Sequence, residues 1–146
     1  MKWQILLTSG VLTLAVLACG GGSKPQTVVS NTPGTSPNLI TALPAGDPAH
    51  GEQLFKGQVD GQYPCSVCHT LTPGKILVGP SLAGIATTAA TRISGHTAEQ
   101  YLRESILTPK AFTVPGFQSG IMPSDFAREM NDQQLADLIA FLLTQK

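Results

Sequence analysis

A short stretch, Cys65-Ser66-Val67-Cys68-His69, constrains this chain more than any other part of it. Two thiols three positions apart lie in the same helical turn, and a histidine follows the second thiol directly. With this spacing both thiols can form thioethers with the vinyl groups on one edge of a haem, and the imidazole reaches the iron. The pattern C-x-x-C-H therefore predicts one covalent haem, with Cys65 and Cys68 as its thioether residues and His69 as a metal ligand.

Two other uses of a C-x-x-C pair remain open at this stage. A zinc site needs four ligands, but the only other cysteine, Cys19, lies in a different sequence context. A thioredoxin-like disulfide pair would favour a βαβ pattern nearby, and the sequence shows none. We therefore prefer the haem interpretation over zinc or a disulfide.

The N-terminus has the features of an export signal. Lys2 precedes an uncharged and mostly apolar segment, 3–18, which is shorter than the about 20 apolar residues of a membrane-spanning helix. Residues 16–19, which end at Cys19, resemble the lipobox of bacterial lipoproteins. We therefore expect a lipoprotein signal peptide at 1–18 and lipidation of Cys19.

The segment 20–46 has the composition of a tether. It is rich in Gly, Ser, Thr, Pro and Asn and carries one charge, at Lys24. Such a segment buries too little apolar surface to fold, and as a flexible coil it spans about 30 Å. We expect a lipidated cysteine and flexible linker at 19–46 and a folded domain at 47–146, exported to the extracytoplasmic (periplasmic) side of a membrane.

Charged residues are too few and too balanced for a nucleic-acid surface. They make up 12% of the chain, with nine basic and nine acidic residues, so nucleic acid is excluded as a partner. The neighbours of the Cys65–His69 motif are also uncharged. Long-range electrostatic steering toward a redox partner should therefore be weak.

Three helices are predicted in the folded domain, each with its own start signal. Asp47 is the N-cap and Pro48 the first residue of a helix that ends near Gly57. Thr97 and Asn131 each have a glutamine three positions later, which forms a capping box at the start of a helix. The second helix ends at position 108, and the last has the strongest apolar periodicity, at Leu135, Leu138, Ile139 and Leu142. No alternating strand pattern competes, so we expect an all-α fold.

The second axial position of the iron decides between electron transfer and ligand chemistry. The candidates are Met122, Met130, His50 and His96. Met122 lies in a stretch rich in Gly, Pro and Ser that can fold over a haem, and Pro123 stiffens the backbone beside it. Met130 is interpreted as a core residue, and both histidines as surface residues. We therefore predict Met122 as the second metal ligand.

In combination these motifs resemble the small monohaem, class I-type cytochromes c over about residues 47–146. The matching positions are Gly51 and Phe55, Cys65–His69, Gly79–Leu82, Met122-Pro123, and Leu138 and Phe141. The resemblance implies a small class I fold in which the first and last helices cross around one covalent haem c. It also implies that the carbonyl of Pro80 accepts a hydrogen bond from His69, and that Leu82 packs on the haem face.

A looser similarity extends to cytochrome c modules of respiratory complexes, such as those fused to haem-copper oxidase subunits and the lipid-anchored monohaem subunit of alternative complex III. Together with the predicted closure of the iron by His69 and Met122 and the expected lipid on Cys19, it favours a membrane-anchored electron carrier, not itself an enzyme, that serves a respiratory or photosynthetic membrane complex and an electron-donor protein. The alternative is a haem enzyme or a gas- or peroxide-binding sensor with a labile sixth ligand. That alternative needs a polar distal group, for which His96 is the candidate.

The sequence departs from the family at the haem propionates. Many members of the family bind a propionate with a tryptophan, but the only tryptophan here is Trp3, in the expected signal peptide. Tyr63, Arg92 and Tyr101 are candidates by their chemistry alone. The sequence leaves the choice among them open.

Overall fold

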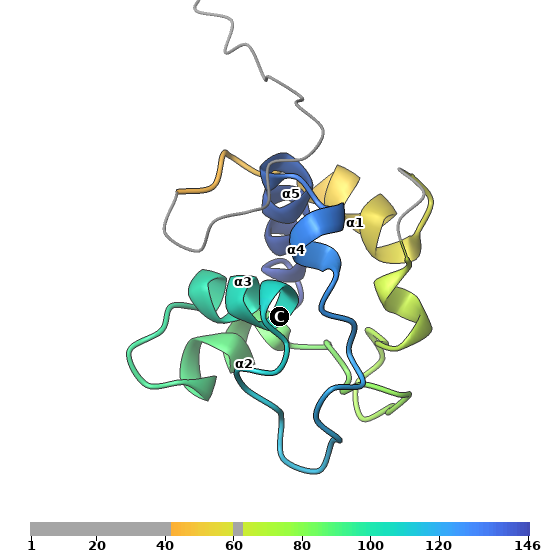
Figure 1. The fold of residues 1–146 in the computed structure, drawn as a ribbon, viewed down its shortest axis with the longest axis vertical. Coiled ribbons are helices and arrows are strands. Elements are labelled where there is room, and N and C mark those ends of the chain that lie inside the picture. The colour runs from red at the N-terminus through yellow and green to blue at the C-terminus, as the bar shows by residue number, and fades with distance from the viewer. Residues whose placement is uncertain (1–41, 60–62) are drawn as a thin grey trace, which may run out of the picture. The chain divides into compact units, whose positions relative to one another are not determined.

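The computed structural model describes residues 42–59 and 63–146. The expected signal peptide, Cys19 and most of the expected linker lie outside these ranges. Within them the chain forms helices and no strand, which confirms the predicted all-α fold (Figure 1). The elements are α1 (Pro48–Lys56), the 3₁₀ turn η1 (Cys65–Val67), α2 (Ile85–Arg92), α3 (Ala98–Leu107), α4 (Phe126–Glu129) and α5 (Asp132–Leu142).

Helix α1 begins and ends at the residues that the sequence indicated. The Asp47 carboxylate accepts a hydrogen bond from the Ala49 N–H at 2.9 Å, and Pro48 is the first helical residue. Gly57 ends the helix in the left-handed conformation, with φ of 68°, which favours glycine.

Helices α3 and α5 both begin with a complete capping box. The Thr97 hydroxyl accepts from the Gln100 N–H at 3.1 Å, and the Gln100 side chain accepts from the Thr97 N–H at 2.8 Å. Asn131 and Gln134 make the same two bonds, both at 2.9 Å. These bonds satisfy N–H groups that a helix start otherwise leaves unpaired, and they confirm the predicted starts.

The first and last helices pack against each other at Gly51. A Cβ atom at this position would collide with the backbone carbonyl of Asp137 and lie 2.8 Å from the Cβ of Phe141. One turn later the rings of Phe55 and Phe141 meet, with centroids 5.5 Å apart and planes inclined by 48°. The contact that the resemblance implied between these two helices is therefore present.

A buried carboxylate also joins α1 to α5. Asp137, which is 2% exposed, accepts hydrogen bonds from the Asp47 N–H at 2.6 Å and from Gln133 Nε2 at 2.8 Å. Its second oxygen accepts from His50 Nδ1 at 2.7 Å. His50 is thus bonded to α5, and its assignment as a surface residue is only partly right.

Two helices in the structure were not predicted. Helix α2 begins after Gly84, which supplies no side-chain cap, and buries only Ile85 and Ala89. Helix α4 is a single turn without a side-chain cap. Helix α2 packs on α3, and α3 also contacts α4 and α5. Met130, after α4, is 3% exposed and belongs to the core, as predicted.

Candidate functional site

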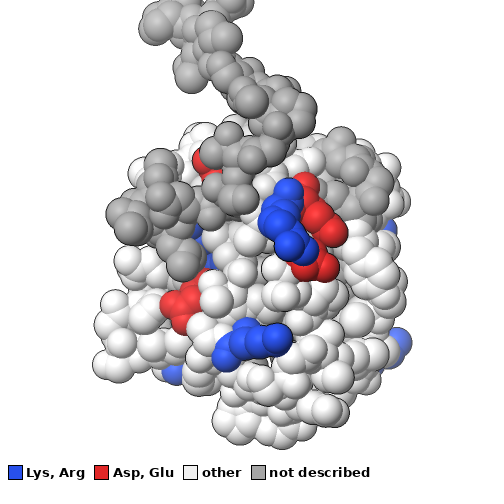
Figure 2. Space-filling view, in the orientation of Figure 1, with Lys and Arg blue, Asp and Glu red and all other residues white. Residues whose placement is uncertain are grey.

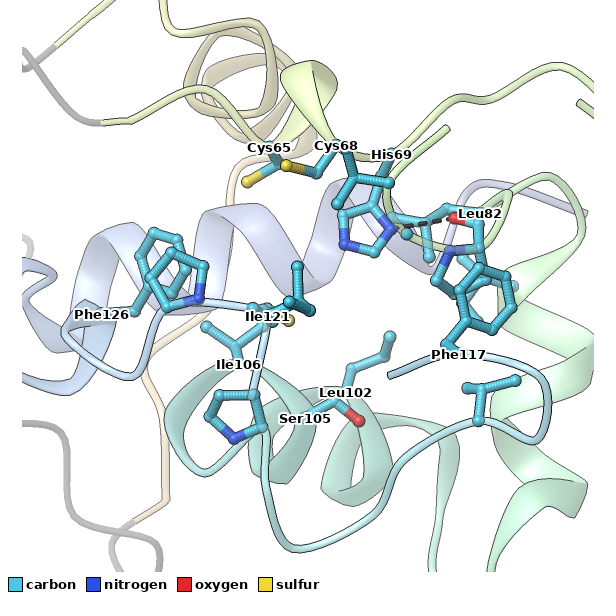
Figure 3. A pocket seen from close by; sticks show the side chains of 18 of the residues that line it. Cys65, Cys68, His69, Leu82, Leu102, Ser105, Ile106, Phe117, Ile121 and Phe126 are labelled. Atoms are coloured by element: carbon cyan, nitrogen blue, oxygen red, sulfur yellow. Dashed lines mark hydrogen bonds between the residues drawn. The ribbon is translucent and has the colours of Figure 1, made fainter. Parts of the chain in front are cut away.

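The turn η1 presents both predicted thioether residues and the histidine to one side. The Cys68 and His69 N–H groups donate to the Cys65 carbonyl at 3.1 and 2.9 Å, which closes a tight turn. Both thiols and the His69 ring lie along one wall of a pocket (Figure 3). The spacing of the motif therefore produces the arrangement that two thioethers and an axial imidazole on one macrocycle require.

The ring of His69 is fixed by its own hydrogen bond. Its Nδ1 lies 2.9 Å from the Pro80 carbonyl oxygen, which can only accept, so Nδ1 carries the proton (dashed line, Figure 3). The hydrogen bond implied by the resemblance is thus present. Burial lowers the pKa of His69, although the bond to Pro80 opposes this shift. A neutral ring with Nδ1 protonated leaves the lone pair of Nε2 available to a metal.

Gly79 leaves the room that this ring occupies. A Cβ atom at position 79 would lie within 3.0 Å of three atoms of the His69 ring. The Gly79 N–H also donates to the Cys68 carbonyl at 2.8 Å, so the loop from 70 to 79 returns directly to the motif. Glycine is required here because a side chain would not fit beside the ring. The backbone conformation at this position is an ordinary one and does not itself require glycine.

The pocket wall is mostly apolar and comes from several distant parts of the chain. Its apolar side chains include Phe55, Leu82, Ile85, Leu102, Ile106, Phe117, Phe126, Leu138 and Leu142. In Figure 3, Leu102, Ser105 and Ile106 of α3 face the wall that carries Cys65, Cys68 and His69. Burial also raises the pKa of the Cys65 thiol to about 11, so this environment favours an uncharged sulfur, as in a thioether.

Met122 reaches the same pocket from a second loop. Its side chain is half-buried and packs against the core, and both Met122 and Pro123 line the pocket. The loop turns at Gly116 and Gly120, whose φ angles are 90° and 81°. The structure thus brings Met122 to the pocket that holds His69, as a pair of axial ligands requires.

The other candidate ligands lie elsewhere. His96 is 3.2 Å from the Glu104 carboxylate and is not part of the pocket wall. His50 is bonded to Asp137, and Met130 is in the core. In the part of the chain that the structure describes, no three His, Cys, Asp or Glu side chains are grouped to hold a metal ion.

Several residues of the pocket wall were not identified as site residues from the sequence. Leu102 and Ile106 lie on the helix that was predicted to begin at Thr97, and Ile85 lies on a helix that was not predicted. Phe117 lies in the loop that precedes Met122. The apolar periodicity of α3 marks the first two, but nothing in one sequence tells a core residue from one that lines a pocket.

A sequence model of the family described as Cytochrome c matches residues 48–146, which include every part of this site. The chain belongs to the cytochrome c family. It is 31% identical over 118 residues to a cytochrome c of Theileria annulata, covering 73% of this chain and 92% of that protein. It is 32% identical over 112 residues to cytochrome c2 of Rhodomicrobium vannielii (72% and 84% covered) and 31% identical over 116 to that of Rhodopila globiformis (72% and 99%).

Members of this family carry covalent haem c and transfer electrons with it. The residues of this cytochrome fit that group. They provide two thiols in one turn, an imidazole with a free Nε2, a glycine where a larger residue would displace the ring, and an apolar wall. When bound, the haem supplies a one-electron iron couple inside an apolar environment.

Proposed function

We propose that this cytochrome is a membrane-anchored one-electron relay whose haem iron is bound by His69 and Met122. The observation that carries the proposal is that both side chains line one apolar pocket. His69 comes from the turn that holds both thiols, and its ring is oriented by Pro80 at 2.9 Å. Met122 comes from a loop more than 50 positions later.

A thioether and an imidazole together leave no open coordination position on the iron. Such a pair favours the ferrous state, raises the potential and suits electron transfer rather than ligand chemistry. The alternative, an enzyme or sensor, relied on His96 as a distal acid–base group. In the structure His96 bonds to Glu104 instead of lining the pocket, so no observation favours that alternative.

The proposed anchor is a lipid on Cys19, with the haem domain on the extracytoplasmic side of the membrane. The support is the sequence: an apolar segment, a lipobox-like 16–19 and a tether-like 20–46. No helix among the described residues is long and apolar enough to cross a membrane. Several acyl chains together would give stable membrane attachment, whereas a single chain binds only marginally.

The proposed docking face for redox partners surrounds the pocket and is apolar. The described large hydrophobic residues that are well exposed are Tyr63, Val67, Ile76, Leu77, Val78 and Ile121. Three of them also line the pocket, and Val67 belongs to the motif turn. In the loop from 70 to 79 only Lys75 is charged.

The face shown in Figure 2 likewise carries scattered charges of both signs and no patch of one sign. Such a surface attracts a partner weakly over long distances. A tether compensates, because it confines the haem domain near a membrane complex and raises its effective concentration there. The proposed partners are therefore an electron-donor protein and a respiratory or photosynthetic membrane complex, which the cytochrome serves as a subunit or a shuttle.

The axial ligands are tested by the visible spectrum of the purified ferric protein. We expect the far-red band of methionine-ligated ferric haem in the wild type and its loss in Met122→Leu. The matched control is Met130→Leu, because Met130 is buried but does not line the pocket, and this variant should keep the band. Survival of the band in Met122→Leu would rule out the ligand assignment.

The anchor is tested separately by phase partition of cells expressing the full chain. Wild-type protein should enter the detergent phase, and Cys19→Ala should shift it to the aqueous phase or leave an uncleaved precursor, with an unchanged haem spectrum. Equal partition of mature Cys19→Ala and wild type into detergent would refute lipidation. Isolation from native membranes in mild detergent would then identify the redox partner.

A further inference from the structure

The carbonyl that orients the His69 ring belongs to a residue with no N–H group of its own. The Pro80 carbonyl oxygen lies 2.9 Å from His69 Nδ1, but proline cannot donate a backbone hydrogen bond to a neighbouring segment. The position of this carbonyl therefore depends on the bonds of the residues on either side, Gly79 and Ser81. On one side the Gly79 N–H donates to the Cys68 carbonyl at 2.8 Å, a backbone bond that does not depend on a side chain.

On the other side of Pro80 a side chain makes the bond. The half-buried Ser81 lines the pocket, and its hydroxyl donates to the Thr72 carbonyl at 2.9 Å. The same oxygen accepts from the Ala83 N–H at 3.2 Å. The hydroxyl is thus used within the loop both as a donor and as an acceptor, which fixes the backbone directly after Pro80.

The segment that accepts this bond follows the motif turn directly and is itself held in place. The Thr72 N–H donates to the Thr70 hydroxyl at 3.0 Å, and the Thr70 carbonyl accepts from the Leu82 N–H at 2.8 Å. The Thr70 carbonyl is also 3.5 Å from the Ser81 hydroxyl, at the outer limit of a hydrogen bond. Removal of the Ser81 hydroxyl would therefore break the side-chain link between the two segments and leave the backbone bond intact.

We propose that Ser81 is a positioning residue for the axial histidine, because its bond to Thr72 holds the Pro80 carbonyl where His69 Nδ1 donates to it. A hydrogen bond at Nδ1 increases the electron donation of Nε2 to a metal. Stronger donation stabilises ferric iron more than ferrous iron, so the Ser81 hydroxyl lowers the potential. This role extends the proposed function, because it rests on His69 as an iron ligand, but it does not depend on Met122 or on the lipid anchor.

A purely structural role for Ser81 would have different consequences. If its hydroxyl only closed the loop, its loss would lower the free energy of unfolding and leave the bond between His69 and Pro80 unchanged. Loss of a hydrogen bond lowers stability under either role, so unfolding does not distinguish them. The potential and the exchange rate of the Nδ1 proton do, because both depend on the hydrogen bond between His69 and Pro80 itself.

The first measurement compares the midpoint potentials of purified holoproteins. We expect Ser81→Ala to raise the equilibrium constant for reduction about three- to fivefold, and Ser81→Thr, which keeps the hydroxyl, to recover at least half of this change. The matched control is Thr144→Ala. It also removes a hydroxyl that donates to a backbone carbonyl, that of Phe141 at 2.7 Å, but neither residue lines the pocket, so the constant should change less than about twofold. A Ser81→Ala constant that falls, or that rises no more than in Thr144→Ala, would overturn the proposal.

The second measurement is the hydrogen exchange of the His69 Nδ1 proton, followed by NMR in the diamagnetic ferrous protein. This proton should exchange about tenfold faster in Ser81→Ala than in the wild type, and at the wild-type rate in Thr144→Ala. An unchanged rate in Ser81→Ala would overturn the positioning role.

The same spectra separate this proposal from the proposed function. The ring current of a haem moves the ring protons of an axial histidine strongly upfield. If the wild type lacks this shift, His69 is not a ligand and the proposed function fails, together with the role of Ser81. If the shift is present but Ser81→Ala changes neither the potential nor the exchange rate, only the role of Ser81 fails.

Discussion

Gly51→Ala is a sharp test of how closely the first and last helices pack. In an isolated helix this change would stabilise, by about 0.5–1 kcal/mol, because alanine has the higher helix propensity. In this structure the added methyl group would meet the backbone carbonyl of Asp137 and the Cβ of Phe141. Helix propensity and the steric contact change the free energy of unfolding in opposite directions, so the sign of the measured change shows which of them is larger.

The size of the effect follows from what the methyl group meets. Adding a methylene to a well-packed contact typically costs about 1–3 kcal/mol. The main obstacle here is backbone in the middle of α5 and not the end of a flexible side chain, so we expect the upper part of that range. After the gain in helix propensity, the net loss is about 2 kcal/mol, or roughly 8–16 °C in Tm for a domain of this size.

The measurement is urea and thermal unfolding of the holoprotein, followed by circular dichroism at the helix band. The matched control is Gln53→Ala, on the same helix but with an exposed side chain, and its stability should change by less than about 0.5 kcal/mol. A Gly51→Ala protein that is as stable as the wild type, or more stable, would refute the close packing of these helices.

Three further results are expected. Gly79→Ala places a methyl group against the His69 ring, so the yield of protein with attached haem should fall at least fivefold, as measured from the haem-to-protein ratio; an unchanged ratio would contradict the space argument. Asp137→Asn removes a buried carboxylate that accepts three hydrogen bonds. Urea unfolding should show a free energy of unfolding that is lower by about 2 kcal/mol. A free energy of unfolding within about 0.5 kcal/mol of the wild type, which is the effect of a surface substitution, would count against this expectation. Electron transfer to a redox partner should depend only weakly on salt because charged residues are few around the pocket, where Arg92 is the only Lys, Arg, Asp or Glu among the described lining residues, and a rate that falls steeply between low and moderate ionic strength would overturn that expectation.

The parts of the fold that the sequence predicted are those with local causes. Asp47, Thr97 and Asn131 start helices through side-chain bonds to residues two or three positions away, so each start can be recognised without knowing the fold. Helix α2 carries no such signal. It begins after Gly84 and buries only two side chains, and its place is set by its packing on α3.

The candidate site also has a part with local causes, which the sequence predicts, and a part that depends on the packing of distant segments. The C-x-x-C-H spacing defines the turn at Cys65 to His69 because its hydrogen bonds are local. The carboxylate of Asp137 bonds to a histidine 87 positions earlier, and such a contact exists only once α1 and α5 have packed. Arg92 and Tyr101 could be named from the sequence as polar candidates, but only the three-dimensional arrangement puts both in the pocket wall.

The bonds between the start of α1 and the side of α5 also determine how the domain bears a mechanical load. The backbone at Ala45 accepts from Gln133 at 2.9 Å, and the backbone at Asp47 donates to Asp137 at 2.6 Å. A pull on the chain from its N-terminal side therefore acts first on α5, through the helix pair that packs at Gly51. The loops that carry His69 and Met122 lie outside this route, so tension on the proposed N-terminal tether would be borne without disturbing the two side chains proposed to bind the iron.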